Sequence, residues 1–373
     1  MAGIYLHVPF CKSRCHYCDF FKSTKIGLVG QYLDRLIEEI EGQKNFFEEN
    51  ESLSTIYFGG GTPSLLSAKN VDEILQHLFH HFRFMKDPEI TLEANPDDLS
   101  KEYLAQLKES GINRLSIGIQ SFFDDDLEKM GRRHSARQSH QVLMDAFDAG
   151  FENVGADLIY GLPWSDQNRL KENLRFFSQY PVKHLSAYHL TIEPGTRFGK
   201  DKARDHLKEI SGEESEKRFQ ILREETAKMG FEHYEISNFC VPGWPSRHNS
   251  AYWTGESYLG LGPAAHSFNG LKRFFNRPDI HGYINKGYAE GVRVENLSEK
   301  DFFNENLMLG LRTKEGVDMG KMAKDFPEYW QQILPHLQKW KKKGFLSDQD
   351  GKLFSTVKGW FVIDGIIEDL FVL

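Results

Sequence analysis

The chain has 373 residues, of which 40% are hydrophobic and 27% charged, as in ordinary globular proteins. At roughly 150 residues per domain, this length predicts two or three domains. The net charge of −8 argues against a protein whose main partner is nucleic acid, because neutralising phosphates needs a surplus of Lys and Arg.

The start of the sequence and its cysteines indicate a compartment. No basic stretch followed by a long apolar run stands near the start, and no window of about 18 uninterrupted apolar residues occurs. Three of the four cysteines lie within eight residues, whereas a disulfide framework would spread them along the chain. We therefore expect a cytoplasmic protein without a membrane span.

Short apolar runs alternate with helical patterns through the first half of the chain. Strands are predicted at residues 4–8, 55–58, 90–94, 114–119, 154–160 and 185–190. Between them, apolar residues recur at helical spacing over residues 29–40, 71–78 and 103–107. This alternation predicts an α/β fold with a parallel sheet covered by helices. Six units are too few for an eight-stranded barrel, so we expect a partial (β/α)6 TIM-type barrel.

The second half changes in composition. A charged helix is expected at residues 213–229 and a short strand at 234–236, and residues 238–275 are rich in Gly, Pro and aromatics without a period. Such a segment predicts a structured loop region or a lid over a ligand. From residue 297, helices followed by a hairpin around Asp350-Gly351 predict a winged-helix-like α+β domain. The expected domains are residues 1–235, 236–296 and 297–373.

The strongest motif is Cys11-Lys-Ser-Arg-Cys15-His-Tyr-Cys18, which directly follows the first predicted strand. Three thiolates on one short loop can surround a corner of a [4Fe–4S] cluster and leave its fourth iron without a protein ligand. That iron can bind S-adenosylmethionine (SAM) and pass an electron to its sulfonium. A zinc site is the alternative, but zinc prefers four ligands and no further pair of cysteines is present.

A run of glycines, Gly59-Gly60-Gly61-Thr62-Pro63, ends the second predicted strand. Glycines let the backbone pass close to a ligand and expose N–H and C=O groups to it. A tight turn is the more common explanation of such a run. A phosphate-binding loop is not expected, because no Gly-Lys-Ser/Thr follows.

Single polar residues lie on or just after the later strands, where sheet proteins place ligand-binding groups. The clearest are Glu93, Gln120, Arg132 and Asp157. A carboxylate inside an apolar run, such as Asp157, needs a partner because an unpaired buried charge is costly. Structural ion pairs and helix caps are the more common explanation of an isolated residue of this kind, so chemistry alone does not assign these residues to a ligand.

An aromatic segment with two histidines stands in the middle of the second half. It contains His248-Asn249 with Tyr252-Trp253 close behind, and a Gly-rich turn that leads to His266. These residues could line a planar apolar pocket with an axial ligand. They could also form a packed, hydrogen-bonded aromatic loop, and chemistry alone favours this explanation.

The cysteine motif, with Tyr5 and His-Val-Pro-Phe before it, resembles the radical SAM superfamily. More narrowly, nearly the whole chain resembles the branch that contains oxygen-independent coproporphyrinogen III dehydrogenase and the haem chaperone HemW family. The resemblance implies a [4Fe–4S] cluster, SAM and haem as cofactors. It also implies that Cys11, Cys15 and Cys18 ligate the cluster.

The resemblance assigns the remaining polar residues as well. It implies a SAM site made of Tyr5, Tyr17, Gly60, Gly61, Thr62, Glu93, Gln120, Arg132 and Asp157. Arg132 matches better by spacing than its neighbour Arg133, and Tyr188 is a weaker candidate near the adenine. The motif H-N-x-x-Y-W is typical of the HemW family, which makes its histidine, His248, a haem candidate, and His266 after the Gly-rich turn is the second candidate.

One position separates the two members of this branch. The dehydrogenases carry a further cysteine two positions after the last cluster cysteine, where this sequence has Phe20. Together with the H-N-x-x-Y-W motif, this favours a haem chaperone, with oxidative decarboxylation of coproporphyrinogen III as the alternative.

The resemblance also implies partners. A haem chaperone passes haem to an acceptor protein, for instance a respiratory protein at the membrane, and a homodimer is compatible with this role. A DNA-binding regulator that uses the winged-helix-like domain is a third hypothesis, which the acidic net charge disfavours.

Overall fold

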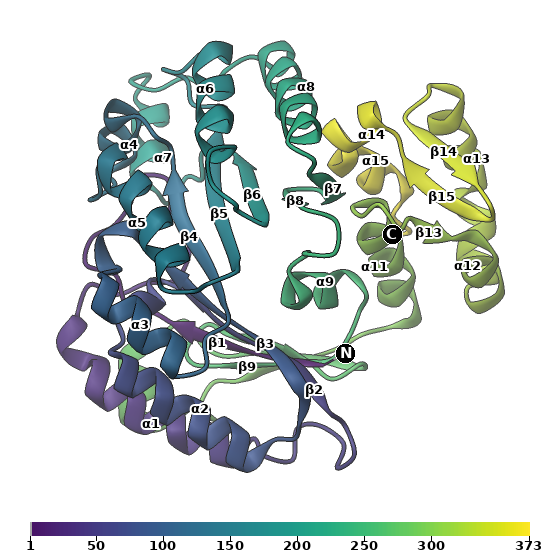
Figure 1. The fold of residues 1–373 in the computed structure, drawn as a ribbon. Helices are drawn as coiled ribbons and strands as arrows, with labels where there is room; N and C mark the ends of the chain where they lie inside the picture. The colour runs from purple at the N-terminus through teal and green to yellow at the C-terminus, as the bar shows by residue number, and fades with distance from the viewer. Residues whose placement is uncertain (1) are drawn as a thin grey trace.

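The computed structural model describes residues 2–373. Its centre is a curved sheet in which six parallel strands follow the order β1-β2-β3-β4-β5-β6 (Figure 1). These strands are β1 (Gly3–Val8), β2 (Leu53–Gly60), β3 (Phe84–Ala94), β4 (Arg114–Gln120), β5 (Asn153–Tyr160) and β6 (His184–His189). The predicted partial (β/α)6 barrel is therefore confirmed, and the sheet stays open.

Helices connect the parallel strands and cover the outer face of the sheet (Figure 1). They are α1 (Val29–Gly42), α2 (Ala68–His81), α3 (Lys101–Glu109), α4 (Asp124–Met130), α5 (Ala136–Asp148) and α6 (Gln167–Phe177), followed by α7 (Arg197–Ala203) and α8 (Gly212–Lys228). Serine side chains cap several of them, and Ser67 and Ser135 each form a capping box. None of the helices among residues 2–373 combines the length and apolar character needed to cross a bilayer.

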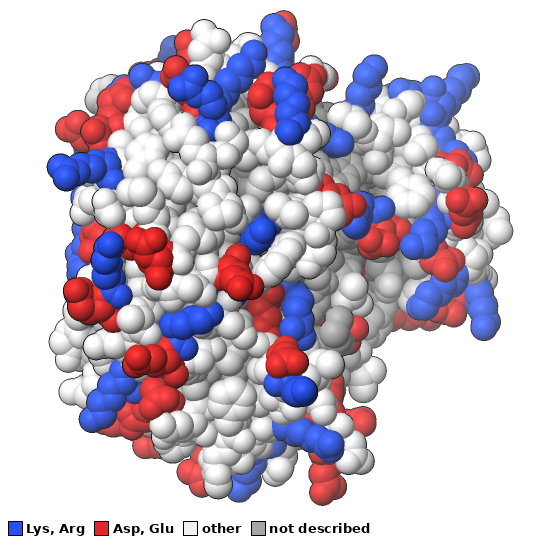
Figure 2. Space-filling view, viewed as in Figure 1, with Lys and Arg blue, Asp and Glu red and all other residues white. Residues whose placement is uncertain are grey.

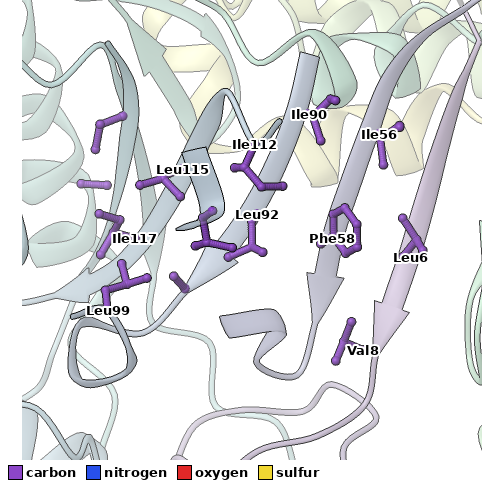
Figure 3. Close-up of a cluster of buried hydrophobic side chains, with 14 of the residues drawn as sticks. Leu6, Val8, Ile56, Phe58, Ile90, Leu92, Leu99, Ile112, Leu115 and Ile117 are labelled. Atoms are coloured by element: carbon purple, nitrogen blue, oxygen red, sulfur yellow. The ribbon is translucent and has the colours of Figure 1, made fainter. Parts of the chain in front are cut away.

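The core lies between this sheet and these helices. Side chains such as Leu6, Phe58, Leu92 and Leu115 project from neighbouring strands into one continuous apolar layer (Figure 3). All four are fully buried, and burying a side chain of this size contributes about 1.5–3 kcal/mol. This layer fixes the strand register, and with it the position of every residue that follows the carboxyl end of a strand.

The stretch over residues 238–275 is not the loop that its lack of period predicted. It contains β8 (Asn238–Cys240), α9 (Arg247–Trp253), β9 (Tyr258–Leu261), β10 (His266–Phe268) and β11 (Lys272–Phe275). β9 pairs in parallel with β1, and β10, β11 and β12 (Arg293–Asn296) continue the sheet in antiparallel fashion. These strands have three or four residues each, too few to show an alternation, so pairing with neighbours defines them.

At the opposite edge of the sheet, β8 pairs antiparallel with β6, and β7 (Glu232–Glu235) pairs with β8. Between these two edges, α9 lies at the open side of the curved sheet and faces the C-terminal part of the chain (Figure 1). The expected boundaries at residues 235/236 and 296/297 remain a prediction.

The C-terminal part has an apolar core of its own, which includes Phe303, Leu307, Leu311 and Ile366. Its helices are α11 (Glu299–Leu311), α12 (Met319–Asp325), α13 (Pro327–Lys342), α14 (Val357–Phe361) and α15 (Ile363–Leu370), and α10 (Ile280–Lys286) precedes them in the main body. A small antiparallel sheet has the order β13-β15-β14, with β13 (Val317–Asp318), β14 (Leu346–Gln349) and β15 (Lys352–Ser355).

The hairpin predicted around Asp350-Gly351 is β14–β15. Asp350 and Gly351 have φ of 50° and 79°, the two left-handed residues that a tight two-residue hairpin turn needs.

Candidate cofactor-binding site

The cysteine loop leaves the carboxyl end of β1 and is fixed by backbone hydrogen bonds. The Cys11 N–H donates to the carbonyl of Ser23 at 3.0 Å, and the His16 N–H donates to the carbonyl of Met130 at 2.9 Å. These bonds hold the three thiols beside the ends of the neighbouring strands. Cys11 is buried, and Cys15 and Cys18 are half-buried.

The three thiols line a cavity of about 510 Å³, the cluster cavity, at the carboxyl ends of β2 to β6. Its wall also includes these predicted residues: Tyr17, Gly60, Gly61, Thr62, Glu93, Gln120, Arg132, Asp157 and Tyr188. Segments up to about half the chain apart thus meet here because parallel strands end at the same edge of a sheet.

Gly60 ends β2 and Gly61 follows it, where the backbone passes close to other parts of the chain. A Cβ on Gly61 would lie 2.8 Å from the carbonyl oxygens of Val8 and Phe10, so no larger residue fits there. Gly60 has a φ of 104°, which side chains other than glycine rarely adopt. Next to them, the Thr62 hydroxyl donates to Cys11 Sγ at 3.4 Å. Burial raises the pKa of the Cys11 thiol, and this hydrogen bond opposes the shift.

The two adjacent arginines have different partners. Arg132 donates to Cys15 Sγ at 3.6 Å and, through Nη2, to Asn95 Oδ1 at 2.6 Å and the carbonyl of Gly118 at 2.8 Å. Its Nε is buried without a partner among the described residues. Arg133 instead forms ion pairs with two carboxylates, Asp97 at 2.7 Å and Asp98 at 3.3 Å.

Gln120 occupies a strained position at the end of β4. The pairing of β4 with β5 shifts register between Ile117 and Gln120, and Gln120 itself has a φ of 64°. Such conformations cost energy and gather at binding sites. Gln120 lines the cavity, and its buried Oε1 has no hydrogen-bond partner among the described residues.

Two carboxylates line the cavity, Glu93 on β3 and Asp157 on β5, with β4 between them. Burial raises the pKa of Glu93 to about 7, against a hydrogen bond from the Tyr57 hydroxyl at 2.8 Å. Burial raises the pKa of Asp157 to about 6, against hydrogen bonds from Ser116 and Ser186. Both groups therefore bind protons more readily than they would in water, and ligand hydroxyls can hydrogen-bond to them.

This donor set fits a [4Fe–4S] cluster with SAM. Three free thiols line the cavity together with Gly60, Gly61, Gln120 and Arg132, and one buried polar atom of each of the last two has no partner among the described residues. Among residues 2–373, no three His, Cys, Asp or Glu side chains converge as ligands of one metal ion would. A cubane binds its thiolates on separate irons, so it does not require that convergence.

Three of the predicted residues lie away from the cluster cavity. Tyr5 is packed inside the sheet, where its hydroxyl is 3.2 Å from His7 Nδ1. His266 stands at the exposed start of β10 with its ring edge-on to Phe275. His248 is 2% exposed, and both of its ring nitrogens are hydrogen-bonded within the protein. Its role as a haem contact stays a prediction, and in this conformation neither nitrogen is free.

Sequence reasoning missed the residues that support the site. Asn95 joins Arg132 to Thr62 through hydrogen bonds of 2.6 and 3.3 Å, and Tyr57 holds Glu93. Asn95 stands two residues after Glu93, so the end of the strand carried a usable signal. Tyr57 gave none, because an aromatic residue inside a strand reads as core.

Comparison with known proteins adds family information to this geometry. Residues 5–177 match the model of the radical SAM superfamily, and residues 297–362 match that of the HemN C-terminal domain. Two similar proteins are named heme chaperone HemW. That of Lactococcus lactis subsp. lactis is 37% identical, covering 86% of this chain and 84% of the relative. That of Bacillus subtilis is 33% identical, covering 96% of each.

A solved structure is similar in fold. It is the coproporphyrinogen III oxidase HemN from Escherichia coli, described as a radical SAM enzyme, with a TM-score of 0.84. The match covers 100% of this chain and 90% of that one at 24% sequence identity. At this identity the likeness concerns the fold.

Proposed function

Because the chain belongs to the haem chaperone HemW family of the radical SAM superfamily, we propose that it binds a [4Fe–4S] cluster, SAM and haem, and delivers the haem to an acceptor protein. The cluster and SAM occupy the cluster cavity. The acceptor is a haem protein, for instance a respiratory protein at the membrane.

The gathering of three free cysteines with glycines and polar side chains in one cavity carries the cofactor part of this proposal. Cys11, Cys15 and Cys18 would hold the cluster, which supplies an iron with an open position for the amino and carboxylate groups of SAM. Gly60, Gly61 and Thr62 would let those groups approach the backbone closely.

The side chains of the strand ends would hold the rest of SAM. Arg132 offers a guanidinium next to Cys15, suited to a carboxylate. Glu93, Gln120 and Asp157 offer acceptors for hydroxyl and amino groups of the adenosine part. Tyr17 would pack on the ligand from the cysteine loop itself.

Haem delivery is favoured over decarboxylation by the relatives' names and by Phe20. Phe20 lines the cluster cavity and is 71% exposed, at the position where the dehydrogenases of this branch carry a cysteine. Phe20 has no thiol to offer to a porphyrinogen at the mouth of the cavity. The decarboxylase remains the alternative function.

The test is anaerobic reconstitution of the full chain followed by two assays. Haem titration should give a saturable shift of the Soret band, and incubation of coproporphyrinogen III with SAM and a reductant should release no CO2. Release of CO2 at enzymatic rates would replace the chaperone with the decarboxylase. A haem titration without any Soret shift would remove the haem part of the proposal.

A further inference from the structure

A second and larger cavity, the interdomain groove, lies between the open side of the sheet and the C-terminal part. It has a volume of about 900 Å³, within the range of small-molecule sites. Figure 2 shows the surface hollowed between these two parts, with uncharged residues on the slopes and charged ones scattered around them. The cluster and SAM proposed for the cluster cavity leave this groove without an assigned ligand.

The two walls of the groove are largely apolar and face each other. One wall is aromatic and comes from α9, β9 and β10: Tyr252, Trp253, Tyr258 and Phe268. The other wall comes from α11, β13 and α12: Phe302, Leu309, Val317 and Met322. A slot between aromatic and aliphatic faces suits a flat apolar ligand, because rings stack on rings and expel water from both faces.

Cations stand at separate places along this slot, each bound to a carboxylate of the other wall. Lys314 pairs with Glu232 at 2.6 Å, and Arg273 holds Glu305 through both of its terminal nitrogens. These pairs hold the two walls together. The same cations can receive the acidic groups at the edge of a ligand.

Helix α9, which carries the H-N-x-x-Y-W motif, is anchored by its first turn. Ser246 caps it, and the Glu89 carboxylate accepts the backbone N–H groups of Arg247 at 3.2 Å and His248 at 3.1 Å. His248 thus points away from the groove into the sheet. Its Nδ1 lies 2.8 Å from Thr55 Oγ1, and its ring stacks on Tyr57 at 4.9 Å.

The remaining nitrogen of His248 reaches the groove wall indirectly. His248 Nε2 lies 3.0 Å from the Tyr252 hydroxyl, and Tyr252 lines the groove. Burial lowers the pKa of His248 to about 3, so the ring is neutral at physiological pH and exchanges one hydrogen bond with each hydroxyl. This bond fixes the ring plane of Tyr252 against the slot.

We propose that the interdomain groove binds a flat, largely apolar macrocycle with acidic edge groups, the class to which haem belongs, and that His248 is a positioning residue that holds Tyr252 against it. This inference rests on the proposed function and deepens it by giving the haem a place. It assigns direct contact to Tyr252 and Trp253 and an indirect role to the histidine of the motif.

The first experiment fills the groove. Asn306 is exposed on α11 and lines the slot, so Asn306→Trp puts an indole into it without touching either core. In a haem titration of the full chain, followed by the Soret band, we expect at least tenfold weaker binding. Ala323→Trp on the neighbouring helix α12 adds the same ring at an exposed position outside the groove and should bind like wild type.

The outcomes separate the two proposals. A wild-type chain that binds no haem overturns the proposed function. A wild-type chain that binds haem, with Asn306→Trp binding equally well and folded by circular dichroism, overturns the groove alone.

The second experiment separates positioning from ligation. Tyr252→Phe and His248→Gln should shift the haem spectrum in the same direction, and the double variant should shift it no further than either single variant. Thr55→Val, which removes the other bond of the ring, should cause a smaller shift of the same sign. A spectrum that changes with His248→Gln and stays unchanged with Tyr252→Phe would show direct ligation by His248 and overturn the positioning role.

Discussion

The cluster cavity and the interdomain groove are built in different ways. The cluster cavity is set by one structure, the parallel sheet, whose strand ends carry Gly60, Glu93, Gln120 and Asp157 to one edge. The groove is set by two apolar cores that meet, with walls from α9 and β9 on one side and α11 and α12 on the other. The first is therefore as rigid as the sheet, and the second depends on how the two cores are held.

A few contacts hold those two cores together. Besides the ion pairs of Lys314 and Arg273, the backbone N–H of Ile236 donates to the carbonyl of Arg312, and that of Lys314 donates to the carbonyl of Tyr234, both at 3.0 Å. Trp360 and Phe361 of α14 also pack against the core of the main body, Trp360 edge-on to His233 and Phe361 beside Phe219, so apolar burial joins the two parts as well.

The two sites are nevertheless connected through the sheet. Glu93 in the cluster cavity accepts a hydrogen bond from Tyr57, Tyr57 stacks on His248, and His248 bonds to Tyr252 in the groove. These four residues, the polar column, form one continuous path of hydrogen bonds and stacked rings. The effect of a ligand or a substitution in one cavity on ligand affinity in the other can therefore be measured.

The largest effect is expected from removing a cluster ligand. Cys11→Ala takes away the buried thiol of the cysteine loop, and two thiolates are too few to retain the cluster. After anaerobic reconstitution, iron and sulfide content and the visible absorption of the cluster should fall close to zero. Haem binding in the groove should persist, because no wall of the groove includes the cysteine loop.

The fourth cysteine provides the matched control. Cys240 is buried on β8 and lines the groove instead of the cluster cavity. Cys240→Ala should reconstitute a full cluster. Loss of the cluster in this variant, or a full cluster in Cys11→Ala, would contradict the assignment of ligands.

A smaller effect, a loss of SAM affinity, is expected from Arg132→Lys in the cluster cavity. Lysine cannot reproduce the fork that reaches Cys15 and Asn95 together, and losing a hydrogen bond to a charged group costs about 1.5–3 kcal/mol. We expect SAM affinity, measured by isothermal titration, to fall by about ten- to a hundredfold.

The neighbouring arginine is the control for this change. Arg133→Lys keeps a cation beside Asp97 and Asp98, so SAM affinity should stay within about twofold of wild type. An equal loss in both variants would mean that the pair acts by overall charge.

The difference between the two sites also explains what the sequence could predict. The cysteine spacing, the glycine run and the polar residues after each strand were readable because local motifs and strand ends follow directly from the sequence. Their assignment to SAM came from the resemblance, and chemistry alone left Glu93 or Asp157 open as structural ion pairs. The parallel sheet itself was predictable from repeated apolar runs.

The groove could be predicted only in part: Tyr252 and Trp253 belong to the H-N-x-x-Y-W motif, whereas the residues of the facing wall share no motif. Tyr252 and Met322 face one slot only after α11 and α12 dock on the open side of the sheet. Likewise β9 joins β1 through a register that four residues cannot specify on their own. The histidine of the motif, His248, was the residue that the sequence singled out. In the structure its ring is buried, and Tyr252, the next aromatic residue of the motif, lines the groove.

A moderate effect is expected when the polar column is cut. Tyr57→Phe removes the hydroxyl that bonds Glu93 and keeps the ring stacked on His248. In wild type, saturating SAM should change haem affinity by about fivefold, and in the variant this ratio should approach one. Because coupling is reciprocal, haem should change SAM affinity by the same factor.

The control for this cut is a ring hydroxyl elsewhere in the chain. Tyr103→Phe removes a hydroxyl that bonds the carbonyl of Leu66, outside the polar column. It should leave the ratio unchanged. A ratio that survives in Tyr57→Phe would mean that the two sites communicate by another route or not at all.

The smallest effect is a pH dependence confined to the cluster cavity. Burial raises the pKa of Glu93 to about 7, above its unfolded value of about 4.3, so the folded chain holds more protons between these pH values. By linkage, the contribution of Glu93 to the free energy of unfolding falls as pH rises through this window. Glu93→Gln removes this titration. Urea denaturation of the cofactor-free chain should therefore show wild type losing stability relative to the variant between pH 5 and pH 6, by on the order of 1 kcal/mol. Glu109→Gln, at the exposed end of α3, reports the effect of removing a surface charge over the same range.

A difference between wild type and Glu93→Gln that stays flat, or rises with pH, would mean that the cavity holds Glu93 as a charged group. In that case the hydrogen bond from Tyr57 outweighs burial, and the upper end of the polar column carries a fixed negative charge.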